Sequence, residues 1–292
     1  MITDHCYSVN AFRIGCVKYL NAHPLIHGWS GEVEFDYPSV LCKRLANGEL
    51  DVALVSSFEF LRNPIYRIVD DVSVSSDGPV YSVVVAHYGN LSQIKEIELD
   101  PASQTAVNLL RCLLAEFELT PRLIRPAPGS AGRQSATGRI GRGEPVVSGS
   151  LPDTKARLLI GDQAIRFRKS HMGEFQFWDL GEQWKKLVGL PFVYALWLIR
   201  PEVTDAKTIA NRLRALRNEN LANLDQLIAG TVAGVGDPGS SKQLDPDFLG
   251  RYYREHLRFS FGEEEKEGLR TFADLCATHG LLERCDFKFK LV

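Results

Sequence analysis

The sequence predicts an α/β fold with a mainly parallel sheet covered by helices. Short apolar runs typical of strands alternate with segments at helical spacing through the first two thirds of the chain. The chain has 292 residues, 45% of them hydrophobic, which is enough for a substantial core in one large or two medium domains. No internal repeat is visible.

The first expected elements lead from strand to helix and back to strand. Strands are expected at 12–17 and 33–37, and a helix at 38–47, where Gly48 is a normal C-terminal glycine. The apolar run at 51–55 indicates a buried parallel strand. Further strands are expected at 66–69, 80–86 and 94–99.

The strongest helix signal covers residues 103–118, with Ser103 as its N-cap. Its apolar face carries Ala106, Val107, Leu110, Leu113, Leu114 and Phe117. Later strands are expected at 122–124, 157–160 and 191–199, and helices at 204–228 and 263–279.

Two expected crossings, near residues 86–87 and 195–199, divide the chain into two hinged lobes. Residues 1–87 and 199–292 then form lobe one, and residues 88–198 form lobe two. We expect the C-terminal helices to pack on lobe one.

Residues 127–150 hold six Gly, four Ser and three Arg, so we expect a flexible surface loop that lacks the apolar area to order itself. Within it, the glycines of 138–143 resemble a phosphate loop. Their spacing is reversed from G-x-G-x-x-G and no strand leads into them, which favours a flexible insertion.

Composition argues against several classes of protein. A net charge of -2 without a long basic run argues against a nucleic-acid partner. The N-terminus has no signal-peptide pattern and no apolar stretch approaches the ~20 residues of a membrane span, so we expect a cytoplasmic protein that does not enter a membrane. Six scattered cysteines without a C-x-x-C motif indicate buried thiols.

Polar side chains follow four of the expected strands. They lie in the segments 19–25, 51–57, 97–105 and 158–162. Because open α/β folds bind ligands at the carboxyl ends of their strands, these residues predict a cleft that binds a small polar ligand.

Seven motifs in a fixed order extend this interpretation. They are IGCVKYLNAHPL at 14–25, NGELDVALVSSFE at 47–59, SSDGPVYSV at 75–83, LDPASQT at 99–105, LIGDQA at 159–164, WDLGEQW at 178–184 and GLPFV at 189–193. Together they closely resemble the chorismate dehydratase family of the futalosine route to menaquinone, over residues 12–283. The resemblance implies a two-lobed, periplasmic-binding-protein-like (type II) fold with a central cleft and two hinge crossings.

The sequence departs from the family pattern at two places. The family usually has Thr-Ser where this chain has Thr105 and Ala106, which removes one hydroxyl from the expected anion pocket, and the loop at 127–150 is longer than usual. The sister dihydroxynaphthoate synthases usually open with a Ser-Pro-Cys-Pro-Asn-Asp type of turn, whereas this chain has Tyr19, Leu20 and Asn21.

The resemblance implies a lyase that removes water from chorismate and needs no cofactor. Ser103, Gln104 and Thr105 are expected to hold a substrate carboxylate at the start of a helix. Asn21 is the expected catalytic residue, because its amide can orient the C4 hydroxyl or the enolpyruvyl group without adding charge; the alternative is a structural turn residue.

Other expected site residues have structural alternatives as well. Ser82 is expected to act in catalysis, and Tyr19, Ser56 and Ser57 in substrate binding, although each serine can instead cap a helix. Asp162 is expected to contact substrate, with a base, a helix N-cap or a salt link between lobes as possible roles. A substrate carboxylate is the other candidate for the base.

Two histidines, His23 and His27, are four residues apart, but Pro24 lies between them and no third ligand has metal spacing, so no metal is expected. The alternative functions are a cytoplasmic small-anion binding protein of the same fold and a 1,4-dihydroxy-6-naphthoate synthase. The oligomeric state is not indicated.

Overall fold

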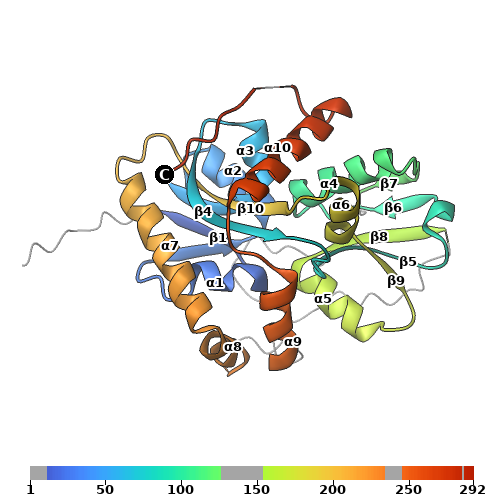
Figure 1. Cartoon of the computed structure of the whole chain (residues 1–292), viewed down its shortest axis with the longest axis horizontal. Helices are drawn as coiled ribbons and strands as arrows, with labels where there is room; N and C mark the ends of the chain where they lie inside the picture. Colours follow the sequence, from blue (N-terminus) through green and yellow to red (C-terminus); the bar gives the residue numbers. More distant parts are fainter. Residues whose placement is uncertain (1–11, 126–153, 234–244, 285) are drawn as a thin grey trace, which may run out of the picture.

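A computed structural model describes residues 12–125, 154–233, 245–284 and 286–292. Two five-stranded mixed sheets lie side by side, each with helices on both faces (Figure 1). We call the first sheet with its helices the first lobe, and the second sheet with its helices the second lobe. The expected loop at 127–150 and the N-terminal segment before residue 12 lie outside the described residues.

The first sheet has the strand order β2-β1-β3-β10-β4. Its strands are β2 (Val33–Asp36), β1 (Ile14–Val17), β3 (Val52–Ser56), β10 (Phe192–Ile199) and β4 (Arg67–Ser76). β1 is parallel to β2 and β3, as expected, but β10 is antiparallel to both β3 and β4. The expectation of a mainly parallel sheet was therefore wrong, because β10 enters this sheet from the second lobe and runs in the reverse direction.

The second sheet has the strand order β7-β6-β8-β5-β9. Its strands are β7 (Arg122–Ile124), β6 (Glu96–Glu98), β8 (Lys155–Ile160), β5 (Val83–His87) and β9 (Gln176–Asp179). β6 is parallel to β7 and β8, whereas β5 is antiparallel to β8 and β9. Each lobe thus has a parallel half and one antiparallel strand that follows a crossing.

The chain passes between the sheets earlier than the sequence pattern predicts. β5 lies wholly in the second sheet and β10 wholly in the first, so the connections between sheets fall at 77–82 and 189–191. The apolar runs at 80–86 and 191–199 mark buried strands, and such a run does not reveal which sheet it joins. The lobe boundaries at 87 and 199 differ from these strand pairings for that reason.

Helices cover both faces of each sheet (Figure 1). On the first sheet, α1 (His23–Ile26) and α7 (Ala206–Ala222) lie on one face, and α2 (Pro38–Ala46), α3 (Ser57–Arg62) and α10 (Glu263–Thr278) on the other. On the second sheet, α5 (Gly161–Ser170) lies opposite α4 (Gln104–Glu116) and α6 (Leu180–Val188). The remaining elements are η1 (Leu20–Ala22), η2 (Leu91–Gln93), α8 (Leu224–Ala233), α9 (Pro246–Arg251) and η3 (Tyr252–His256).

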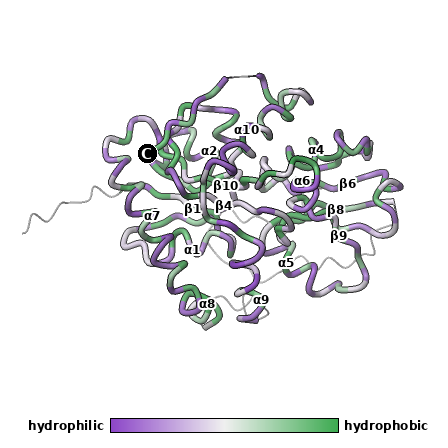
Figure 2. Tube along the Cα trace, viewed as in Figure 1, coloured by the Kyte–Doolittle hydropathy of each residue, from purple (hydrophilic) through white to green (hydrophobic). Residues whose placement is uncertain are grey.

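The core lies along the central strands. β1, β3, β5 and β10 are buried along their whole length, and hydrophobic residues concentrate there (Figure 2). α4 follows the expected pattern, and the Ser103 hydroxyl accepts a hydrogen bond from the Ala106 amide, which confirms the N-cap. Phe117 differs from the expected face: it follows the last helical residue and is 39% exposed.

Among the described helices, none combines the length and the apolar character that crossing a membrane would require.

Candidate functional site

The two lobes meet where β3 of the first lobe ends and α4 of the second begins. Ser56 is the last residue of β3, and its hydroxyl lies 2.7 Å from the Thr105 hydroxyl and 3.4 Å from the Ser103 hydroxyl. The Thr105 amide also donates to the Ser56 hydroxyl, at 3.1 Å. Three of the expected binding residues therefore form one buried cluster across the lobes, which we call the hydroxyl cluster.

Ser57 completes the hydroxyl cluster from the start of α3. Its hydroxyl donates to the Val193 carbonyl at 2.7 Å and lies 3.3 Å from the Thr105 hydroxyl. Thr105 also accepts a hydrogen bond from the Phe58 amide, at 3.0 Å. The Ser57 and Thr105 side chains are 0% exposed, so both are occupied by protein partners in this arrangement. A ligand would reach Ser56 and Ser103 more readily.

A second contact between the lobes joins the turn after β1 to the start of α5. The Asp162 carboxylate accepts a hydrogen bond from the Leu20 amide at 3.0 Å. Beside it, Gly161 has φ +61°, and a Cβ there would lie 2.7 Å from the Tyr19 ring. Asp162 thus links the lobes through a backbone amide rather than through the salt link that was one expected alternative, and Tyr19 packs against the opposite lobe.

Asn21 lies in the middle of η1, directly after Leu20. Its side chain is partly buried, and its Oδ1 atom is buried without a hydrogen-bond partner among the described residues. A buried amide oxygen without a partner costs free energy unless something pairs with it. The atom is therefore suited to accept a hydrogen bond from a ligand.

Ser82 stands just before β5, where the chain enters the second lobe. It is 1% exposed, and its hydroxyl accepts a hydrogen bond from the Tyr252 hydroxyl at 2.8 Å. Its carbonyl accepts from the Gly161 amide at 2.7 Å, so Ser82 and the Gly161–Asp162 turn are direct neighbours. Together with Tyr19, Asn21, Asp162 and the hydroxyl cluster, Ser82 lines what we call the seam between the lobes.

Titratable groups of the seam are shifted by burial. Burial raises the pKa of the Asp162 carboxyl to about 6, despite the opposing hydrogen bond from the Leu20 amide. Burial also raises the pKa of Asp100, and the pKa of the Tyr19 phenol is raised by burial and by the nearby Asp100, Tyr37 and Asp162. Tyr19 therefore lies near both carboxylates and stays protonated at neutral pH.

Gln104 differs from its neighbours in the expected pocket. It is the first residue of α4 and is partly buried, but its side chain makes no hydrogen bond to any residue in the described ranges.

In the same ranges there is no group of three or more side chains with the chemistry of metal ligands. Burial lowers the pKa of His23, whose Nδ1 lies 3.5 Å from the Thr231 hydroxyl.

Sequence reasoning missed Tyr252 and Tyr253, which both reach the seam from the C-terminal part of the chain. The Tyr253 hydroxyl donates to the Leu20 carbonyl at 2.9 Å. These residues stand between two expected helices, and no strand ends beside them in the sequence. A pair of adjacent tyrosines shortly after Asp245 and Pro246, a helix start, is the one signal that the sequence offers.

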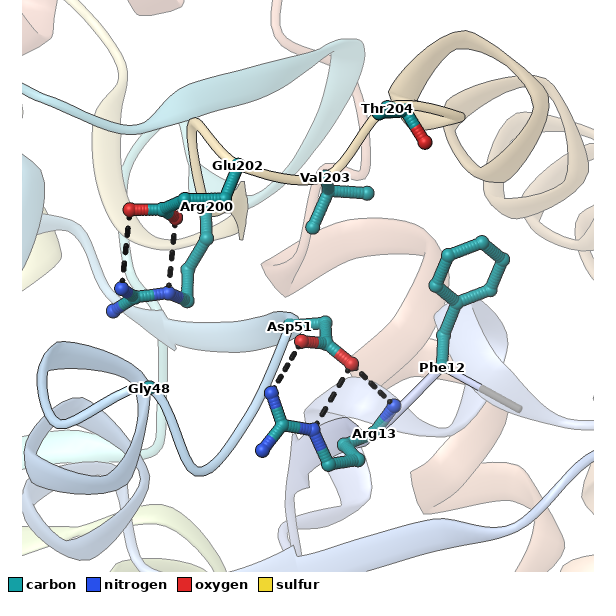
Figure 3. Close-up of a pocket in the computed structure, with 8 residues that line it drawn as sticks. All are labelled: Phe12, Arg13, Gly48, Asp51, Arg200, Glu202, Val203 and Thr204. Carbon is teal, nitrogen blue, oxygen red and sulfur yellow. Dashed lines mark hydrogen bonds and ion pairs between the residues drawn. The ribbon is translucent and has the colours of Figure 1, made fainter. Parts of the chain in front are cut away.

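A cavity of about 430 Å³ lies away from the seam, at the opposite edge of the first sheet (Figure 3). Two ion pairs line it: Arg13 with Asp51 at 2.5 Å, and Arg200 with Glu202 at 3.2 Å. Because each guanidinium already has a carboxylate partner, the cavity offers little to a charged ligand. A second cavity, of about 480 Å³, is lined by α8, α9 and Arg254.

Comparisons with known proteins cover nearly all of the described structure. A family model described as menaquinone biosynthesis matches residues 12–140 and 144–278. The chain is also 28% identical, over 273 residues, to the chorismate dehydratase of Thermus thermophilus. That alignment covers 90% of this chain and 94% of the relative.

Solved structures support the architecture. An ABC transporter protein from Parabacteroides distasonis has a TM-score of 0.63 and 12% identity, with 97% of this chain and 99% of that chain covered. The periplasmic aliphatic sulphonate binding protein SsuA from Escherichia coli has a TM-score of 0.58 and 13% identity, with 94% of both chains covered. These likenesses confirm the two-lobed, periplasmic-binding-protein-like fold.

Proposed function

The chain belongs to the menaquinone biosynthesis family, and from that premise we propose that it is a hydro-lyase that converts chorismate to 3-[(1-carboxyvinyl)oxy]benzoate and water, in the futalosine pathway. The family match carries the proposal, because it runs through both lobes and includes every strand end of the seam. The relative from Thermus thermophilus has the same activity in its name. We also propose that the enzyme acts in the cytoplasm and that its substrate is this small molecule.

The proposed reaction is an elimination on the ring of chorismate. The C3–H bond breaks and its proton passes to a base, while its electron pair forms the C3=C4 double bond. The C4–O bond breaks, and the departing hydroxide takes up a proton to give water. Because the ring becomes aromatic, the protein has mainly to position the substrate, accept the C3 proton and stabilise the leaving oxygen.

The seam offers groups suited to these tasks. We assign Asn21 and Ser82 to the leaving hydroxyl, since both are neutral and add no charge beside a dianion. Ser103 at the start of α4 is suited to a substrate carboxylate, because a helix start attracts anions. Tyr19, Ser56 and Gln104 complete the proposed substrate surface. Ser57 and Thr105, which are occupied by protein partners in this structure, would join it only when the seam opens.

Two groups can serve as the base. Asp162 has a pKa of about 6, so most of it is ionised at neutral pH, but one of its oxygens is held by the Leu20 amide. A carboxylate of chorismate itself is the other candidate. We favour the substrate carboxylate, because the hydrogen bond from the Leu20 amide makes Asp162 a link between lobes.

Purified protein incubated with chorismate tests the function directly. We expect the aromatic enol ether to appear by chromatography and mass spectrometry, with no added cofactor and with undiminished rate in EDTA. A protein-free sample corrects for spontaneous decay of chorismate. Calorimetric binding of chorismate without conversion would identify a small-anion binding protein instead, and a rate that EDTA abolishes and a divalent ion restores would contradict cofactor independence.

A further inference from the structure

Two adjacent tyrosines of the C-terminal segment reach both sides of the seam. Tyr252 and Tyr253 are 1% and 2% exposed. The Tyr252 hydroxyl donates to the Ser82 hydroxyl at the entrance to the second lobe, and the Tyr253 hydroxyl donates to the Leu20 carbonyl in the first lobe. One short segment therefore contacts both Ser82 and the turn that carries Asn21, the two residues assigned to the leaving hydroxyl.

The backbone of this segment is unusual. Tyr252–His256 forms a π-helical turn directly after α9, whose start is capped by Asp245 accepting from the Phe248 amide at 2.6 Å. π-helical turns are rare in proteins, and those that occur are often found at functional sites. In the view of Figure 1, α9 lies between α8 of the first lobe and α5 of the second.

The Tyr252 contact fixes the direction of the Ser82 hydrogen bond. Burial raises the pKa of the Tyr252 phenol, so the phenol keeps its proton at neutral pH and donates a hydrogen bond to the Ser82 hydroxyl. A serine hydroxyl has one proton to donate. Because its oxygen already accepts from Tyr252, the Ser82 proton is left to donate to another acceptor in the seam.

The Tyr253 contact fixes the turn that carries Asn21. The backbone of Leu20 is held on both sides. Its carbonyl accepts a hydrogen bond from the Tyr253 hydroxyl at 2.9 Å, and its amide donates one to the Asp162 carboxylate at 3.0 Å. Tyr253 also stays protonated, because burial raises the pKa of its phenol. Asn21 follows Leu20 directly, so both contacts restrict where its buried Oδ1 lies.

We propose that Tyr252 and Tyr253 are positioning residues for the elimination: Tyr252 directs the Ser82 proton toward the leaving hydroxyl, and Tyr253 holds the Leu20–Asn21 turn against it. This inference rests on the proposed function. Neither tyrosine touches substrate, and each acts through a named neighbour.

A double-mutant cycle tests the role of Tyr252. Tyr252→Phe keeps the ring and removes the hydroxyl, so kcat should fall about 10- to 100-fold while KM changes less than about threefold. In a Ser82→Ala background, the same change should cost no further rate, because the group through which Tyr252 acts is already gone. A Tyr252→Phe loss that is as large without Ser82 as with it would overturn the proposal, as would an unchanged kcat.

Tyr66→Phe is the matched control. Tyr66 is 0% exposed, and its hydroxyl lies 3.4 Å from the Asn63 amide nitrogen. It stands just before β4, at the edge of the first sheet where β3 begins, which is opposite the seam. Its loss should lower the thermal midpoint as Tyr252→Phe does but leave kcat unchanged. Equal kcat losses in both variants would show a general effect of core hydroxyls and overturn the proposal.

Tyr253→Phe gives an independent arm if Tyr252→Phe does not fold. It should lower kcat about tenfold or more in the wild type and have no further effect in Asn21→Ala; equal effects in both backgrounds would overturn it. If the wild type binds chorismate without converting it, the proposed function fails, and the same cycles read on chorismate affinity still decide the positioning. Tyr252→Phe should then lower the affinity for chorismate when Ser82 is present and should not lower it in the Ser82→Ala background.

Discussion

Asn21 and Asn220 have opposite hydrogen-bonding states. The Asn220 amide donates to the Pro24 and His27 carbonyls at 3.1 and 2.9 Å, which fastens α7 to α1. The Asn21 Oδ1 atom is buried and has no partner within the described parts of the chain. An asparagine that caps a turn would accept a backbone hydrogen bond at its Oδ1 atom, so the unpartnered Oδ1 of Asn21 supports a role toward a ligand.

We expect Asn21→Ala to lower turnover of chorismate about a hundredfold or more, in line with the loss of one preorganised polar contact. The thermal midpoint should change little, because no group in the described ranges loses a hydrogen bond to the Asn21 Oδ1 atom. Steady-state kinetics and thermal unfolding measure the two quantities. Asn220→Ala is the control and should show a lowered midpoint with a nearly normal kcat. Normal turnover by Asn21→Ala would leave Asn21 as a turn residue.

Asp162 predicts a pH dependence of stability. Burial raises its folded-state pKa to about 6 from the ordinary value of 3.8, so the folded protein binds this proton more tightly than the unfolded chain. The stability contributed by the protonated form is therefore complete below about pH 4 and is lost as the pH rises through about 6. Asp162→Asn keeps an acceptor for the Leu20 amide and removes the ionisation.

The variant should consequently gain stability relative to the wild type between pH 4 and 7, by up to about 3 kcal/mol for a shift near two units. Urea unfolding of both proteins across this range measures the difference. Asp51→Asn is the control: the hydrogen bond from Arg13 lowers the pKa of Asp51, so its difference from the wild type should be flat over the same range. A flat difference for Asp162→Asn would contradict the raised pKa.

At the scale of elements, the junction between β8 and α5 depends on Gly161. Its φ of +61° is left-handed, and a Cβ there would meet the buried Tyr19 ring at 2.7 Å. Gly189, which ends α6, has φ +79°, and no atom of the described part of the chain lies within 4 Å of an added Cβ. The two glycines therefore differ in one respect: a side chain of the opposite lobe packs closely against Gly161 but not against Gly189.

We expect Gly161→Ala to destabilise the protein more than Gly189→Ala. Both variants incur the left-handed cost of roughly 1–2 kcal/mol, but the first also pushes the Tyr19 turn away from α5. Unfolding free energies from urea titration compare the two variants. Equal losses would mean that the lobes do not meet tightly at Tyr19 in solution.

At the scale of the whole molecule, entry of a ligand into the proposed site would require the seam to open. The Ser56–Thr105 and Leu20–Asp162 contacts close it in this structure. The connections at 77–82 and 189–191 carry left-handed backbone at Gly78, Tyr81 and Gly189, and such connecting residues are where hinge motion is absorbed. The fold thus provides both a closed contact and two short connections.

We expect chorismate to shift the protein in solution toward the closed form, with a smaller radius of gyration than the ligand-free protein. Small-angle scattering with and without chorismate measures the change, and acetate serves as a control that supplies a carboxylate without the ring. Superimposable scattering profiles at a saturating chorismate concentration would contradict closure.

Much of the fold and part of the site followed from local pattern. The helix at α4 and its Ser103 cap were predictable, because helical periodicity and capping depend on neighbours a few residues apart. The polar residues Ser56, at the end of β3, and Asp162, just after β8, were predictable because each follows a short apolar run in the sequence. The motif order also predicted the family that the comparison shows.

Tertiary structure alone decided which strand joins which sheet, and which polar groups meet. β5 and β10 are apolar runs whose pairing depends on residues far away in the chain. The contacts of Tyr252 with Ser82 and of Tyr253 with Leu20 join residues separated by 170 and 233 positions, so no local pattern announces them. Local chemistry sets the elements and their polar ends, whereas packing of the two lobes determines which of those ends share a site.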